Sequence, residues 1–149
     1  MKKVLIIALL LSFGVVEYGY SQAQFKVITV VESIVPGGLG RSRLIESTSE
    51  VNIDDFTTER TDGKKSDQGS VKRSDAKIDE FSESKLLNFY SLAGINFQNI
   101  ASNDALITSK INQMLSDGWE LVFVTSAAES DAGKQDGDGI YITRLFFKK

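Results

Sequence analysis

The residues best suited to chemistry are carboxylates near the C-terminus, in the segment ESDAGKQDGD at 129–138. They are Glu129, Asp131, Asp136 and Asp138. Ca²⁺ prefers carboxylate oxygens as ligands, and two facing carboxylates are also the arrangement of a glycosidase acid and base. However, the spacing is not that of an EF-hand loop, and Lys134 would lie among the ligands. We interpret the segment as a solvated hairpin loop, with a metal site at Asp131, Asp136 and Asp138 as the alternative.

A glycine-rich stretch with two arginines, GGLGRSR at 37–43, is the second candidate. Gly-rich backbone can form an anion-binding nest. Arg41 and Arg43 would point to one side of a strand, where they could bind a carboxylate or phosphate. A phosphate-binding loop needs a helix directly after it, whereas Leu44 and Ile45 continue an extended pattern. We interpret the stretch as a hairpin turn with exposed arginines, and anion or partner binding as the functional alternative.

The chain contains no His and no Cys. This composition excludes the usual zinc, copper and iron ligands, Cys nucleophiles, the Ser–His–Asp triad and disulfide bonds. Any catalysis would have to use carboxylates, Lys, Ser or Tyr, and we expect no cofactor. The leading hypothesis is therefore a non-enzymatic binding or accessory module. The rival hypotheses are a hydrolase that uses Asp131 and Asp136, and a Ca²⁺-stabilised structural domain.

The N-terminal segment has the layout of a secretory signal peptide. Lys2 and Lys3 precede an apolar run at 4–16, and the SQA motif at 21–23 supplies the small residues before a cleavage point. A membrane-spanning helix needs about 20 apolar residues, so the run is too short for an uncleaved anchor. No Cys follows that could carry a lipid. We expect cleavage after Ala23 and export to the periplasm or beyond, without a stable membrane anchor.

The remaining residues, 24–149, have the length of one domain. Residues 1–23 carry a net charge of +1, so the formal net charge of −3 for the whole chain becomes −4 for the exported part. A mild excess of acidic residues argues against nucleic acid as a partner and against attraction to an anionic membrane surface. We expect an envelope protein or a small ligand as the partner, and a homo-oligomer is a further alternative.

Strand patterns flank a polar stretch in the first half of this domain. The segment FKVITVVES at 25–33, a Pro-Gly-Gly turn at 36–38 and extended residues at 41–46 predict a β-hairpin. Residues 48–82 are rich in charges, and their few apolar residues cannot offset the entropy of ordering the chain. We expect a flexible surface excursion there, with a segment that folds on binding as the alternative.

The second half contains the clearest helix. Ser102, Asn103 and Asp104 are good N-cap residues, and apolar residues recur at helical spacing up to an Asp-Gly stop at 117–118. The pattern predicts a helix over 103–117 and strands after it at 119–126 and 139–148. Before it, the segment from Lys85 could be a strand or a short helix, and we favour a strand that ends near Ala93. We therefore predict an α+β fold, a small antiparallel β-sheet with one main helix packed across one face.

The helix-to-strand junction INQMLSDGWELV at 111–122 resembles a known signature. The pattern LN-x-x-G-x-x-GWELV belongs to the small bacterial domain-of-unknown-function family 4177, whose first and last strands are similar to residues 25–28 and 141–144. The resemblance covers about half of the exported chain, and the stretches at 48–82, 86–100 and 129–138 are additional. It implies this fold and makes Trp119 a core anchor beneath the helix. The family has no established activity, so no catalytic residue is transferred.

Overall fold

The computed structural model describes residues 23–34, 41–129 and 139–149 of this chain. The predicted signal peptide, the Pro-Gly-Gly turn and the acidic loop after Glu129 lie outside the described residues.

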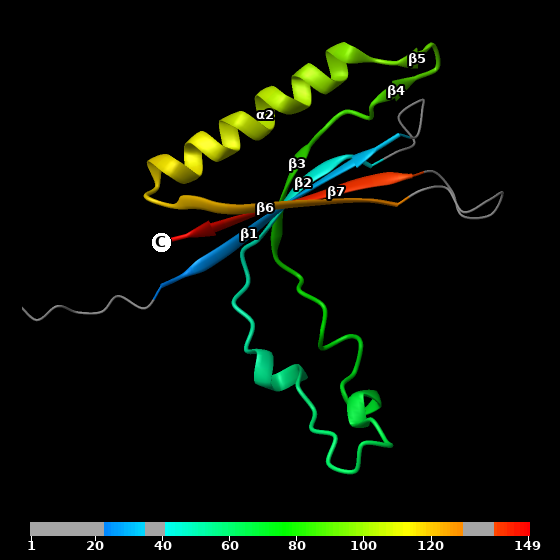
Figure 1. Cartoon of the computed structure of the whole chain (residues 1–149), viewed down its shortest axis with the longest axis vertical. Helices are drawn as coiled ribbons and strands as arrows, with labels where there is room; N and C mark the ends of the chain where they lie inside the picture. The colour runs from blue at the N-terminus through cyan, green and yellow to red at the C-terminus, as the bar shows by residue number, and fades with distance from the viewer. Residues whose placement is uncertain (1–22, 35–40, 130–138) are drawn as a thin grey trace, which may run out of the picture.

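An antiparallel sheet of five strands, in the order β3-β2-β1-β7-β6, forms the body of the molecule (Figure 1). Its strands are β1 (Phe25–Ser33), β2 (Arg43–Ser47), β3 (Phe81–Lys85), β6 (Glu120–Glu129) and β7 (Ile140–Lys148). The central strand β1 pairs with β7 along its whole length and with β2 from Ile28 to Val31. The predicted β1–β2 hairpin pairing is confirmed.

One long helix, α2 (Phe97–Ser116), lies across one face of this sheet (Figure 1). Between helix and sheet, the buried apolar residues form the core: Ile28, Val30, Leu44, Leu86, Met114, Leu145 and Phe147. Those in strands or in the helix are on the face that alternation or helical spacing predicts, and Leu86 follows directly after β3. The α+β prediction, a small antiparallel sheet with one main helix on one face, is confirmed.

The start of the helix was predicted wrongly. Asn96, not a residue of the 102–104 triplet, is the N-cap, and its side chain accepts a hydrogen bond from the backbone N–H of Asn99. Asn103 lies two turns inside the helix and is completely buried. Its amide has partners outside the helix, which explains why an N-cap residue type occupies an interior position. The helix ends as predicted, with Gly118 at φ 82°.

Two very different connections leave the sheet. Residues 48–80 form a long polar arm that extends away from the β2–β3 hairpin (Figure 1) and contains two 3-10 turns, Ile53–Phe56 and Asp67–Ser70. The predicted excursion reached residue 82, but β3 begins at Phe81. On the other side, residues 86–96 join β3 to α2 through a small hairpin of β4 (Tyr90–Ser91) and β5 (Gly94–Ile95).

The predicted strand ending near Ala93 is wrong, because residues 86–89 are irregular and only Tyr90 and Ser91 extend into a short strand. The backbone groups of this segment bond to the side chains of Asn99 and Asn103 on the helix and to the backbone carbonyls of Ser33 and Ser42, instead of to a long neighbouring strand. No helix within the described part of the chain is both long and apolar enough to cross a bilayer.

Candidate functional site

The two arginines of the sequence analysis do not form a free anion clamp. Arg41 is exposed just before β2, whereas Arg43 is half-buried within it. The Arg43 guanidinium donates a hydrogen bond to the carbonyl of Ser42 at 2.9 Å, and its Nε lies 3.8 Å from a Glu83 carboxylate oxygen. An anion would have to compete with Glu83 for Arg43.

The acidic candidates Asp131, Asp136 and Asp138 lie outside the described residues, so only Glu129, at the end of β6, is placed. In the described ranges, no three His, Cys, Asp or Glu side chains come together in a way that could hold a metal ion.

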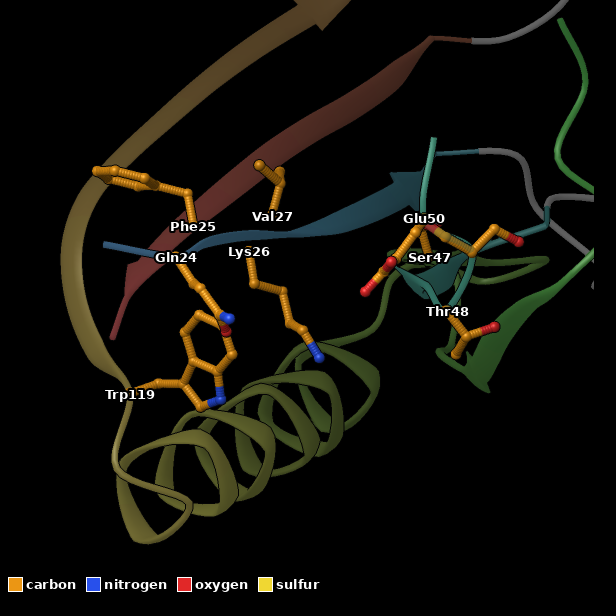
Figure 2. Close-up of a pocket in the computed structure, with 9 residues that line it drawn as sticks. Gln24, Phe25, Lys26, Val27, Ser47, Thr48, Glu50 and Trp119 are labelled. Atoms are coloured by element: carbon orange, nitrogen blue, oxygen red, sulfur yellow. Dashed lines mark hydrogen bonds between the residues drawn. The ribbon is translucent and has the colours of Figure 1, made fainter. Parts of the chain in front are cut away.

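Trp119 borders a cleft of about 620 Å³ beside the start of β1 (Figure 2). Its other walls are Gln24, Phe25, Lys26, Val27 and residues 47–50. The indole is half-buried and packs against the core. Two ammonium groups lie near its ring, with Lys26 Nζ at 5.4 Å and Lys149 Nζ at 5.9 Å from the centroid.

A three-residue ionic cluster lies beside this cleft and joins the helix to the sheet. Glu46 on β2 accepts from Lys26 on β1 at 2.8 Å and pairs with Lys110 on α2 at 2.6 Å. Burial alone would raise the pKa of the Glu46 carboxyl, but the hydrogen bonds and charges of Lys110 and Lys26 outweigh burial and lower it. The sequence analysis missed this cluster, although strand alternation places Lys26 on the helix-facing side of β1.

Several polar groups in and near the cleft are engaged with the protein itself. Lys26 is bound to Glu46, Lys149 Nζ donates to the carbonyl of Asp117 at 2.7 Å, and Ser49 Oγ donates to the carbonyl of Glu80 at 3.1 Å. These contacts tie the end of the helix to the C-terminus and close the base of the arm, and they leave fewer polar groups available to a ligand.

The segment between β3 and α2 is anchored by the buried side chain of Asn103. Its Oδ1 accepts from the backbone N–H of Leu87 at 2.8 Å, and its Nδ2 donates to the Leu87 carbonyl at 2.8 Å and to the Glu32 carboxylate at 2.9 Å. This amide thus satisfies both backbone groups of one residue, as a neighbouring strand would. Leu87 is therefore hydrogen-bonded at both of its backbone groups, as a residue inside a sheet is.

Further hydrogen bonds hold the next two residues. The buried Ser42 hydroxyl donates to Asn88 Oδ1 at 2.8 Å, and Asn99 Nδ2 donates to the Asn88 carbonyl at 2.8 Å. The backbone N–H of Phe89 donates to the Ser33 carbonyl at 3.0 Å. The Phe89 ring also packs on Tyr141 of β7, with 5.6 Å between the ring centroids. The segment is therefore tied to β1, β7, the start of β2 and α2.

Glu32 belongs to the same network. Burial raises the pKa of its carboxyl, the negative charge of Asp104 raises it further, and the hydrogen bond from Asn103 only partly opposes this. The pKa of Glu32 is therefore shifted in the direction opposite to that of Glu46.

The anchored segment presents large apolar side chains to solvent. Leu92 is 91 % exposed and Phe97 is 73 % exposed. Tyr90 and Ile95 are a cross-strand pair and share one face of the hairpin. We call the exposed apolar residues of this region the apolar platform: Leu87, Tyr90, Leu92, Ile95 and Phe97.

A hollow of about 460 Å³ adjoins the platform, and Leu87, Tyr90 and Leu92 are among the residues that line it. From residue 86 to residue 103 the chain contains no Asp, Glu, Lys or Arg. Composition alone does not distinguish a core segment from an exposed one that is held in place, so the sequence does not predict the exposure of these residues.

Comparison with known proteins gives no relative for this chain. No family model matches it, and neither the curated proteins nor the solved structures contain a match. The resemblance to domain-of-unknown-function family 4177 therefore stays an expectation from the sequence.

Proposed function

We propose that this chain is an exported, non-enzymatic binding module of the bacterial cell envelope, and that the apolar platform is the surface that contacts its partner. The observation that carries the proposal is the combination of exposure and anchoring. Leu92 and Phe97 face solvent, yet the segment between β3 and α2 is held at Leu87 and Asn88 by buried or partly buried hydrogen bonds with Asn103, Ser42 and Asn99. Ordering a chain in this way costs conformational entropy, and a pre-ordered surface binds with less further loss.

The chemistry of the platform favours a protein as the partner. The centres of protein interfaces are depleted of charge and enriched in aromatic residues, which is the composition of residues 86–103. The adjoining hollow could receive an apolar side chain, as the pockets around interface hot spots do.

A lipid surface is a poorer match. Membrane-surface segments usually carry Lys or Arg beside their apolar residues, whereas the charged groups next to the platform network are Glu32 and Asp104. The same two carboxylates suit a partner that places Lys or Arg beside an apolar side chain.

Affinity capture with matched variants tests the proposal. We expect the tagged chain to retain a defined partner from envelope extract, and Leu92→Asp to abolish this by placing a charge in the interface centre. Ile53→Asp is the control, because Ile53 is 72 % exposed on the arm and should tolerate the change. Equal retention of the partner by both variants would count against a protein partner at the platform. Removal of the chain from solution by phosphatidylcholine vesicles would also count against it. Sequencing the N-terminus of the exported chain, expected at Gln24, tests export separately.

A further inference from the structure

The two edges of the sheet differ in their protection. Edge strands present unpaired backbone groups, and proteins usually protect them with charged residues, Pro or a short length. β3 is short and carries Glu83 and Lys85. β6 is ten residues long, and its stretch 121–128 contains no charged residue and no Pro. Among the residues that the structure describes, no strand pairs with the outer side of β6.

The ladder identifies the backbone groups that face outwards from β6. Gln24 and Lys149 exchange both of their hydrogen bonds, each at 2.9 Å, so Lys149 and every second residue before it in β7 point towards β1. The intervening residues of β7, including Arg144, therefore point towards β6. Arg144 is paired with Thr125, so the N–H and C=O groups of Val124, Ser126 and Ala128 point away from the sheet.

We infer that β6 pairs in antiparallel fashion with β6 of a second copy of this chain, with the two-fold axis at Ser126. The register shift between Leu121 and Phe123 limits the regular edge to residues 123–129, of which Ser126 is the centre. Only in this register do Val124, Ser126 and Ala128 all lie opposite residues of the partner whose backbone groups also point outwards. Ser126 then meets its own copy, and Val124 meets Ala128 of the partner.

The charges of the edge are compatible with a second copy. A two-fold interface sets the same surface against itself, so a charged edge would repel its own copy. In the register centred on Ser126, Glu129 lies opposite Phe123 of the partner and not opposite another carboxylate. The dimer would have one continuous sheet and would carry two apolar platforms. This inference rests on the edge alone and does not depend on the proposed role of the platform.

Light scattering coupled to size exclusion, on the full chain expressed with its own N-terminal segment, tests the pairing. We expect a dimer, and we expect Ser126→Pro to make it monomeric, because this change removes an outward N–H and leaves the β6–β7 ladder intact. Ser126→Ala controls for the loss of the hydroxyl contact with Thr143, which measures 2.9 Å. Glu83→Pro introduces a proline on the outer side of the other edge strand, β3, and should leave the dimer unchanged.

Cysteine cross-linking tests the register on folded protein, and the native chain has no Cys to interfere. Thr125 would lie directly opposite Ala127 of the partner, at a side-chain separation of about 5 Å, and residues two places apart would be at about 7–8 Å. Mixed Thr125→Cys and Ala127→Cys chains should therefore form a disulfide on mild oxidation far faster than either chain alone. A monomer at all concentrations, a dimer that survives Ser126→Pro, or no preference for the mixed pair would overturn the inference.

Discussion

The polar arm and the apolar platform are both excursions from the same sheet, and they are built in opposite ways. The arm at 48–80 is rich in charges, and apart from the bonds across its base its hydrogen bonds stay within the arm, such as Asn52 with Asp54 and Asp62 with Lys64. The platform segment has no charge but is tied by hydrogen bonds to residues far away in the chain. Both regions are therefore exposed to solvent, but they differ in how they are held in place.

This contrast indicates which of the two exposed regions is suited to binding. Charged residues need no packing to remain soluble, so an arm of this composition can stay exposed without stabilising contacts. Exposed Leu, Tyr and Phe side chains lower solubility and are costly to hold in water. Their presentation by a hydrogen-bonded segment is the feature that a binding surface would explain.

The largest expected effect is at the anchor of the platform. Asn103→Ala removes the partners of the Leu87 N–H and C=O groups and of Glu32, and leaves buried polar groups unsatisfied. We expect a loss of about 2–4 kcal/mol in the free energy of unfolding, measured with urea. The matched change on the arm is Asn52→Ala, which removes an exposed cap and should cost less than about 0.5 kcal/mol. Equal effects of the two variants would remove the distinction between the regions.

A smaller effect is expected at the base of the arm. Glu46→Gln removes the charge that Lys26 and Lys110 share, and should cost about 1 kcal/mol at neutral pH. Because the pKa of Glu46 is lowered in the folded state, the unfolded chain binds its proton first as the pH falls below 4.5. The stability that Glu46 contributes is thus present above pH 4.5 and lost below it. Urea midpoints of wild type and variant should converge in acid.

Glu32, at the base of the platform, should show the opposite dependence of stability on pH. The pKa of its carboxyl is raised, so its ionisation destabilises the folded state as the pH rises from 4.5 through the folded pKa. Glu32→Gln keeps an acceptor for Asn103 and should raise stability slightly at pH 7, with no gain below pH 4. A loss of stability at pH 7 would show that Glu32 acts mainly through its charge.

The smallest effect is expected for removal of the arm. Thr48 and Glu80 are hydrogen-bonded across the base of the arm, and β2 and β3 pair up to Ser47 and Phe81. Replacing residues 49–79 by Asn-Gly should give a tight hairpin and change stability by less than about 1 kcal/mol, because loop length has a weak effect on closure. Circular dichroism and urea unfolding would measure this. A collapse of the fold would mean that the arm is structural.

The sequence predicts strands β1, β2, β6 and β7 because each contains its own evidence, whereas β3 was not predicted and lies partly in the stretch expected to be a flexible excursion. Alternation in residues 25–33 and 139–148 specifies which side chains face the helix, and Gly118 marks the end of the helix. The platform could not be predicted because its structure depends on distant partners. Asn103 resembles an N-cap when only its neighbours are considered, and its bond to Glu32, 71 residues away, decides its role. The apolar residues beside it match a core pattern until their exposure is known.

Site-specific photo-cross-linking in the native envelope tests whether the apolar platform contacts a partner protein. A benzoylphenylalanine placed at Leu92 on the platform is compared with one at Ile53 on the arm, since both side chains are largely exposed. The account predicts that Leu92 gives one discrete adduct with another protein and that Ile53 gives none. No adduct at Leu92, or the same adducts from both positions, would contradict it.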